Sequence, residues 1–190
     1  MQTWITLAIL AAVAIYGVAI FNGLVRRRNL MREGWSGIDV QLKRRTDLVP
    51  NLVETVKAYA AHEHTVLAEV TAMRASSVAA TDVGSQASAE RGLQASLGKL
   101  LAVAEAYPDL KADKNFLALQ EQLAGIEDQL QMARRYYNGT VRNLNIAVQS
   151  FPASLLAGLL GFRTEPYFEL DDRGEATAPA VAFPAPQSQP

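Results

Sequence analysis

The feature that most constrains this chain is an uncharged apolar run near its N-terminus, Trp4 to Val25, with the sequence WITLAILAAVAIYGVAIFNGLV. As an α-helix, residues 4–25 extend about 33 Å, enough to cross a hydrocarbon core about 30 Å thick. A single segment in that environment must be helical, because only then are its backbone hydrogen bonds satisfied internally. The run therefore predicts one transmembrane helix at residues 4–25, preceded by a short extracytoplasmic N-terminus at residues 1–3.

A cleaved signal peptide and a buried core helix are the two competing interpretations of this run. A signal peptide carries positive charge before a shorter apolar stretch and a small-residue cleavage site after it. Here the preceding residues, MQT, are uncharged, and Arg26, Arg27 and Arg28 follow the run at once. Helices in soluble cores rarely hold so long an uncharged stretch. The order of the charges favours a retained anchor.

Basic residues crowd the C-terminal flank of the anchor. Residues 26–45 contain two acidic residues, Glu33 and Asp39. The basic residues in the same range are Arg26, Arg27, Arg28, Arg32, Lys43, Arg44 and Arg45. The positive-inside rule keeps such a flank in the cytoplasm. This predicts a single-pass protein of the cell (inner) membrane, N-terminus out, with residues 26–172 in the cytoplasm. The same cluster is suited to contact anionic lipid, at about 1 kcal/mol per basic residue near the surface.

Beyond the anchor, apolar residues recur at alternating spacings of three and four. The first seam consists of Trp35, Ile38, Leu42, Arg45, Val49, Leu52, Val56, Tyr59, Glu63, Val66, Val70 and Met73. This seam predicts an amphipathic helix over residues 34–76. A polar turn at 76–85 follows. A second helix is expected over 86–107, with the seam Leu93, Leu97, Leu100, Ala104 and Tyr107. A third is expected over about 116–151, with the seam Phe116, Leu119, Leu123, Ile126, Leu130, Ala133, Tyr137, Thr140, Leu144, Ala147 and Phe151.

Three long amphipathic helices with short connections predict an all-α protein. We expect one N-terminal transmembrane helix followed by a long antiparallel bundle of three to four helices, occupying residues 26–172. Such sustained heptads also permit coiled coils between copies, so a homo-oligomer is an open alternative. The Pro/Ala-rich tail at 173–190 is expected to be disordered.

Pro50 interrupts the first of these helices, within DLVPNLV. Inside a helix, proline removes the hydrogen bond to the carbonyl four residues back, that of Thr46, and costs about 3 kcal/mol unless compensated. The apolar register continues on both sides, so we expect a kink rather than a helix end. Asp47 and Asn51 are adjacent polar residues that could bond the freed carbonyl directly or through water. A binding notch is the functional alternative to a structural bend.

An uncharged segment, SFPASLLAGLLGF, occupies residues 150–162. As a helix it extends about 20 Å, too short to span a membrane, and Pro152 starts a short fourth helix. We expect it to cap the open end of the bundle; a protein-binding patch and an interfacial membrane contact are the alternatives. The patch would consist of Phe151, Leu155, Leu156, Leu159, Leu160 and Phe162. If the helices alternate direction strictly, this segment lies far from the anchor, which argues against the membrane contact.

The sequence offers no catalytic constellation. It contains no cysteine, which excludes disulfides and thiolate chemistry. His62 and His64 point about 200° apart on a helix and do not form a metal-binding pair. Phosphate-binding glycine loops and GxSxG are missing, and a net charge of −1 does not favour nucleic-acid binding. We therefore expect no enzyme, no cofactor or metal, no small-molecule substrate and no nucleic-acid partner.

The stretch ARRYYN, residues 133–138, combines arginines with tyrosines. Tyr137 continues the seam of the third helix, which favours core packing with Arg134 and Arg135 in solvent. A contact with an anion or a phospholipid headgroup is the functional alternative.

Three stretches resemble the LemA family of bacterial membrane proteins: WSGIDVQLKRRTDLVPNLVETVKAYAAHE, YPDLKADKNFLALQEQL and ARRYYNGTVRNLNIAVQSFPASLLAGLLGF. The resemblance covers about residues 30–170 in unbroken order, and the combination of RRxDLVPNLV, ARxxYN and an FP-containing end is specific. It implies one N-terminal transmembrane helix, a long antiparallel bundle and an N-out, C-in topology. It brings no catalytic residues with it.

These observations favour a membrane-anchored, non-enzymatic scaffold or adaptor that binds protein partners or itself at the cytoplasmic face. The alternative is a lipid- or envelope-stress-sensing element that uses the basic residues from Arg26 to Arg45. An unrecognised enzyme or metal protein is the third hypothesis, and it has no supporting motif.

Overall fold

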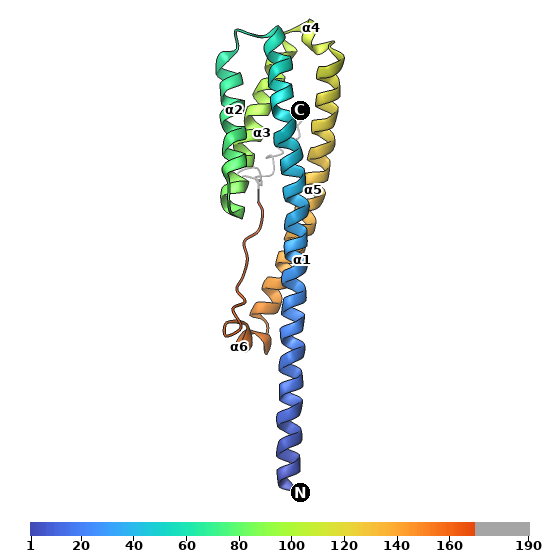
Figure 1. Ribbon diagram of the computed structural model, residues 1–190, viewed down its shortest axis with the longest axis vertical. Helices are drawn as coiled ribbons and strands as arrows, with labels where there is room; N and C mark the ends of the chain where they lie inside the picture. The colour runs from blue at the N-terminus through green and yellow to red at the C-terminus, as the bar shows by residue number, and fades with distance from the viewer. Residues whose placement is uncertain (170–190) are drawn as a thin grey trace, which may run out of the picture.

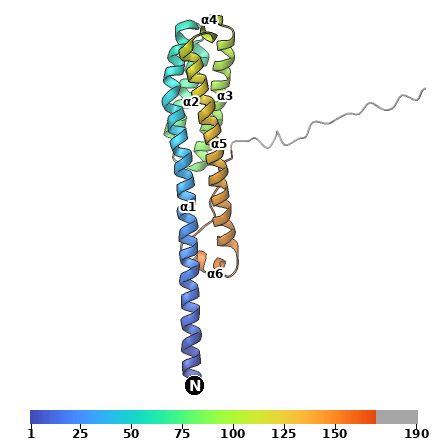
Figure 2. The same cartoon turned by 90° about the vertical axis from the view of Figure 1, so that its right-hand side faces the viewer.

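The computed structural model describes residues 1–169, in which every regular element is a helix (Figure 1). In chain order these are α1 (Gln2–Tyr59), α2 (His64–Ala79), α3 (Val83–Glu105), α4 (Pro108–Lys111), α5 (Lys114–Gln149) and α6 (Ala153–Ala157). The long helices α1, α2, α3 and α5 alternate in direction and form an elongated bundle, from which the start of α1 projects (Figures 1 and 2). The expected all-α antiparallel bundle is confirmed. The tail expected to be disordered, 173–190, lies outside the described residues.

The anchor and the first bundle helix are a single continuous helix. α1 contains 58 residues, which corresponds to a length of about 87 Å. Every residue from Met1 to Tyr16 is exposed, and contacts with the rest of the chain begin near Ile20 and Leu24. Near the N-terminus α1 contains a stretch of 18 residues, none of them buried, and the helix is long and apolar enough to cross a membrane. Bare apolar surface of that extent is unusual for a helix in water.

The helix expected over residues 34–76 is two helices, and this part of the prediction was wrong. α1 ends at Tyr59 and α2 begins at His64. The reversal is closed by the Ala60 N–H, which donates to Val56 O at 2.8 Å, and Ala60 is fully buried. Folding back here packs the apolar face of α2 against α1 in one core. The 3-4 spacing continues across the break, so periodicity did not reveal it.

The extra reversal also changes where the chain finishes. Because α2 runs back along α1, α3 runs away from the anchor and α5 returns toward it (Figure 1). Segment 150–162 therefore lies beside Leu24, where Ala157 and Phe162 complete a small core. The expectation that this segment lies far from the anchor is wrong, because it assumed one reversal too few.

α1 and α5 form the longest helix pair, and a glycine sets how closely they approach. Gly34 is buried, and a Cβ atom at this position would lie 3.1 Å from the Cα atom of Tyr137. The two backbones therefore touch where Gly34 meets Tyr137, and a larger residue at 34 must separate them.

After α6 the chain returns along α5 as an extended segment fixed by two asparagines. Asn145 accepts from Glu165 N at 2.8 Å and donates to Glu165 O at 2.9 Å. Asn138 makes the same pair of bonds to Phe168, at 2.9 and 3.1 Å. Seven helical residues rise about 10.5 Å and three extended residues cover about 10 Å, so the two spacings match. Phe168 is thereby buried against Trp35, with ring centroids 5.7 Å apart.

Candidate functional site

The basic residues flanking the anchor fall into two environments. Exposed on α1 are Arg26, Arg27, Arg32, Lys43 and Arg44, whereas Arg28 is half-buried and Arg45 is buried. The Arg28 guanidinium lies 4.6 Å from the ring centroid of Phe162, a cation–π contact that ties α1 to the segment after α6. The five exposed residues keep the predicted role of contacting lipid; this role stays a prediction.

Arg45 is not available to contact lipid, because its guanidinium group forms ion pairs inside the bundle. Its Nη1 atom lies 3.3 Å from Glu90 Oε2 on α3 and 3.4 Å from Glu127 Oε2 on α5. The side chains of Arg45 and Glu90 are 6% and 0% exposed. At that depth an unpaired charge would cost several kcal/mol, so each group requires the other.

Polar side chains from α2 and α3 complete this buried cluster. Ser77 and Gln86 both donate to Glu90 Oε1, the latter at 3.1 Å. The Glu90 carboxylate thus joins α1, α2 and α3, and Arg45 extends the cluster to Glu127 of α5. The cluster therefore fixes how the four long helices align.

Sequence reasoning missed Glu90, although the seam contained a signal. Extending the spacing of the second helix backward from Leu93 gives Glu90 three residues earlier and Gln86 four before that. Arg45 interrupts the apolar seam of α1 in the same way. Two opposite charges on facing seams are the pattern expected of a buried ion pair.

The Thr46 carbonyl, which Pro50 leaves without its helical donor, accepts a hydrogen bond from the neighbouring helix α2. α1 continues through Pro50 to Tyr59, and Arg74 Nε of α2 donates to Thr46 O at 2.8 Å. The two adjacent polar residues are engaged elsewhere or in solvent: Asp47 forms a 3.2 Å ion pair with Lys43, and Asn51 is exposed. The kink at Pro50 stays a prediction.

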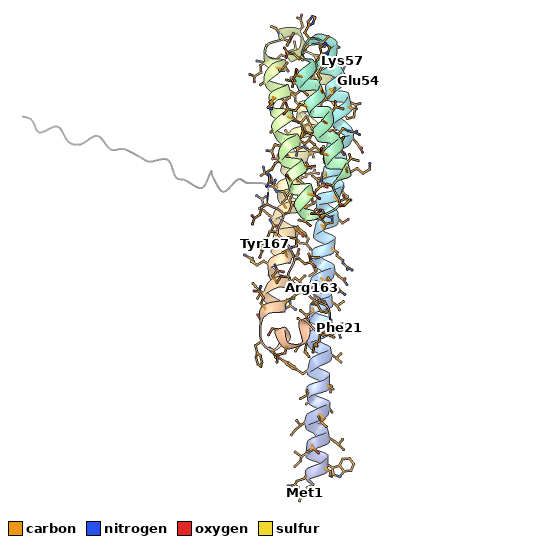
Figure 3. The ribbon with its side chains drawn as sticks, turned by 90° about the vertical axis from the view of Figure 1, so that its left-hand side faces the viewer. Met1, Phe21, Glu54, Lys57, Arg163 and Tyr167 are labelled. Atoms are coloured by element: carbon orange, nitrogen blue, oxygen red, sulfur yellow. The ribbon has the colours of Figure 1, made fainter. Side chains whose placement is uncertain are left out.

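The apolar residues of segment 150–162 divide into a buried and an exposed group. Phe162 is buried and packs edge-to-face on Phe21 with ring centroids 6.1 Å apart, and Leu156 is half-buried. The exposed group, which we name the terminal patch, consists of Phe151, Leu155, Leu159 and Leu160. Figure 3 shows Phe21 at the level of this segment, with Met1 far beyond it along α1. Phe162 therefore does not belong to an accessible partner surface.

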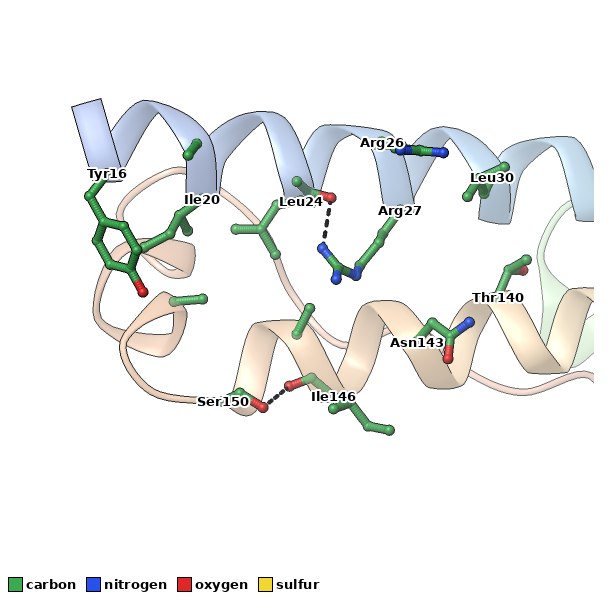
Figure 4. A pocket seen from close by; sticks show the side chains of 14 residues that line it. Tyr16, Ile20, Leu24, Arg26, Arg27, Leu30, Thr140, Asn143, Ile146 and Ser150 are labelled. Atoms are coloured by element: carbon green, nitrogen blue, oxygen red, sulfur yellow. Dashed lines mark hydrogen bonds between the residues drawn. The ribbon is translucent and has the colours of Figure 1, made fainter. Parts of the chain in front are cut away.

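A groove of about 820 Å³ runs between α1 and the end of α5 (Figure 4). We name it the anchor groove; its lining residues are Tyr16, Ala19, Ile20, Gly23, Leu24, Arg26, Arg27, Leu30, Thr140, Asn143, Ile146, Ala147, Ser150 and Ala153. Its apolar end lies within the uncharged run and its basic end lies just after it. Arg27 Nη1 donates to Gly23 O at 3.1 Å.

Tyr137 and the N-cap residues of α3 and α5 have displaced pKa values with structural causes. Burial raises the pKa of Tyr137 to about 12, and the Glu165 charge adds to this shift. The hydroxyl and backbone N–H of Ser85 lower the pKa of Asp82, the N-cap of α3. The Phe116 N–H lowers the pKa of Asp113, the N-cap of α5. Within residues 1–169, no group of three or more His, Cys, Asp or Glu side chains is placed to hold a metal ion.

These features define a class: an α-helical bundle carried on one N-terminal helix that is long and apolar enough to cross a membrane. Residues 34–183 match the family model described as the LemA family, and the chain belongs to this family. The resemblance found in the sequence is thereby confirmed.

Three related proteins are similar to this chain over most of its length. It is 24% identical over 202 residues to magnetosome protein MamQ of Magnetospirillum gryphiswaldense, a match covering 92% of this chain and 74% of that protein. It is 24% identical over 197 residues to magnetosome protein MamQ 2 of Paramagnetospirillum magneticum, covering 89% and 72%. With protein LemA of Metamycoplasma hominis it shares 26% identity over 153 residues, covering 80% and 69%. The apolar helix and these relatives together suggest a membrane-associated protein.

Proposed function

We propose that the chain is a membrane-anchored, non-enzymatic helical scaffold or adaptor that binds a protein partner or a second copy at the cytoplasmic face of the inner membrane. The observation that carries this proposal is the continuity of α1 from Gln2 to Tyr59. One unbroken helix supplies both the apolar anchor and a wall of the bundle core. Forces on the anchor and on the bundle are therefore transmitted without an intervening flexible linker, as a scaffold requires.

The terminal patch supports a binding role. Phe151, Leu155 and Leu159 are 80%, 66% and 86% exposed, on a segment in which Ala157 and Phe162 are buried against α1. Exposed apolar side chains that are clustered rather than scattered are typical of partner or membrane contacts. The partner would meet the protein beside the emerging end of the anchor.

The topology part of the proposal rests on the exposed basic residues after the apolar run. Arg26, Arg27 and Arg32 resist translocation, which favours retention of the bundle in the cytoplasm. Fusing a reporter after Pro190 tests this directly. A fluorescent protein should fluoresce and an alkaline phosphatase should stay inactive; the reverse pair of results would contradict the cytoplasmic placement.

The scaffold role is tested by site-specific photo-crosslinking in native membranes. A photoreactive residue at Leu159 should yield a defined adduct with a protein or with a second copy of the chain. The same residue at Ala118, exposed on α5 near the distal end, is the matched control and should yield little. Equal yields at both positions, or adducts to lipid alone at Leu159, would contradict a protein-binding patch.

The second candidate is a lipid- or envelope-stress-sensing role for the basic segment. It is favoured by the side chains of Arg26, Arg27, Arg32, Lys43 and Arg44, which stay exposed while Arg45 is withdrawn into the core. Reconstitution in vesicles with and without anionic lipid tests it. An unchanged pattern of self-association and protease protection in the two vesicle types would argue against sensing.

A further inference from the structure

The anchor groove has the length of one membrane leaflet. Along α1 it extends from Tyr16 to Leu30, which corresponds to about 21 Å of helix. Half of a bilayer with its headgroup regions is about 20–22 Å thick. The volume of about 820 Å³ is also within the range of sites that enclose a sizeable small molecule.

The groove changes character along its length in the same order as a phospholipid. At one end Tyr16, Ala19 and Ile20 belong to the uncharged run; at the other Arg26 and Arg27 follow it. Antiparallel α5 contributes Ile146 and Ala147 toward the first end, where the hydroxyl of the following Ser150 donates to Ile146 O at 2.7 Å, and the polar residues Thr140 and Asn143 toward the second. Acyl chains match the first end and a headgroup matches the second.

The charge at the polar end is positive and uncompensated within the groove. None of the described lining residues is acidic. Within residues 1–169, neither Arg26 nor Arg27 takes part in a salt bridge. Figure 4 shows the Arg27 side chain reaching from α1 toward α5, with Asn143 on the opposite wall. A guanidinium group in this position is suited to paired hydrogen bonds with phosphate oxygens.

Of the three consecutive arginines, Arg28 alone does not line the anchor groove. Its guanidinium lies against the ring of Phe162, on the side of α1 occupied by α6 and the returning chain. Arg26 and Arg27 thus line the groove, whereas Arg28 holds the protein together.

We propose that the anchor groove binds one anionic glycerophospholipid, with its phosphate held by Arg26 and Arg27 and its acyl chains lying along Ile20 and Ile146. The proposal rests on the membrane anchorage of α1 but not on which leaflet the basic end faces. The bound lipid would fill the groove between α1 and α5, and would couple the bundle to the lipid composition around its anchor.

Native mass spectrometry of the full-length protein, released from nanodiscs of phosphatidylcholine with a minor share of phosphatidylglycerol, tests this. The wild type should retain one phosphatidylglycerol. In Arg26→Gln/Arg27→Gln the retained fraction should fall roughly thirty-fold, which is about 2 kcal/mol at 1.4 kcal/mol per tenfold. Asn143→Trp, which fills the groove without changing charge, should lower retention as well. Added inorganic phosphate should not displace the lipid.

The matched control is Arg142→Gln/Arg163→Gln, which removes the same charge from two exposed residues outside the groove. It should retain lipid like the wild type. Equal loss in both double variants would show general surface attraction, and equal retention in all variants would show no site; either result overturns the proposal. Displacement by phosphate alone would identify an anion site and overturn the lipid assignment. Failure of the wild type to enter nanodiscs would instead overturn the membrane anchorage itself.

Discussion

Arg74 of α2 donates a hydrogen bond from its Nε atom to the carbonyl oxygen of Thr46 at 2.8 Å. This is the carbonyl that the residue at position 50 would normally bond, had it a backbone N–H. A proline in one helix and an arginine in the next are therefore a complementary pair. The arrangement also fixes the height at which α2 packs on α1.

Arg74→Met should destabilise the protein by about 1–3 kcal/mol, because it leaves a buried carbonyl without a donor. In a Pro50→Ala background the restored N–H takes the Thr46 carbonyl, so the same substitution should cost clearly less. Denaturant unfolding in detergent measures both. Arg91→Met, at an exposed arginine of α3, is the control and should stay within about 0.5 kcal/mol. Equal costs in the two backgrounds would contradict the pairing.

Arg45→Met alone should cost about 3–5 kcal/mol, since it leaves the buried carboxylate of Glu90 without its cation. Glu90→Leu should cost less, because Arg45 keeps its ion pair with Glu127 at 3.4 Å. The double variant should be much less destabilised than the sum of the two, because the one charge left without its partner, Glu127, is 27% exposed. The exposed pair Lys99–Glu69, 2.7 Å apart, provides the control, and removing both of its charges should cost less than about 1 kcal/mol. Additive losses at Arg45 and Glu90 would show that they act independently.

Gly34→Ala should destabilise the protein despite the better helix propensity of alanine. The new Cβ atom would lie 3.1 Å from the Tyr137 Cα atom, and separating two packed helices typically costs about 1–3 kcal/mol. Gly125→Ala is the matched control on α5, since no atom lies within 4 Å of its Cβ position. It should stabilise by up to about 1 kcal/mol. A melting temperature that rises in both variants would rule out a close contact at Gly34.

Tyr137 should remain protonated in the folded state until the pH approaches about 12, because burial and the Glu165 charge raise its pKa. The raised pKa favours folding fully below pH 10, near the unfolded pKa, and this contribution is lost as the pH rises through about 12. Absorbance of ionised tyrosine and unfolding across this window measure the effect. Tyr137→Phe should flatten the decline in stability, whereas Tyr136→Phe, at an exposed neighbour, should not. Ionisation of Tyr137 near pH 10 in the folded protein would contradict the burial effect.

The seam patterns in the sequence predicted which faces are buried on α1, α3 and α5. Leu42, Val49 and Leu52 are buried as the first seam requires, and Leu130 and Leu144 as the third requires. Arg45 stood in the first seam, but its partner Glu90 was not predicted, although a charge at a core position needs a partner. These features are local in the chain and repeat with the helix.

Other features of the fold depend on the direction in which each helix runs, and the apolar periodicity carries no information about direction. The turn at 60–63 keeps the hydrophobic spacing, so the sequence predicted one helix where there are two. The position of the terminal patch and the existence of the anchor groove both follow from that turn. The returning segment at Glu165–Phe168 depends on Asn138 and Asn145, whose seven-residue spacing becomes meaningful only once an extended chain lies beside α5.

The turn at 60–63 also makes the number of long helices in residues 1–169 even, and this determines how the bundle is held at its anchor. An odd number of long helices would leave the closing segment at the distal end, with α1 as a lone pivot about which the rod could swivel. An even number returns Phe151, Leu155 and Leu159 to the end where α1 emerges. A surface that contacts both α1 and these side chains holds the bundle at two points. Two contacts fix both the tilt of the bundle and its rotation about the axis of α1.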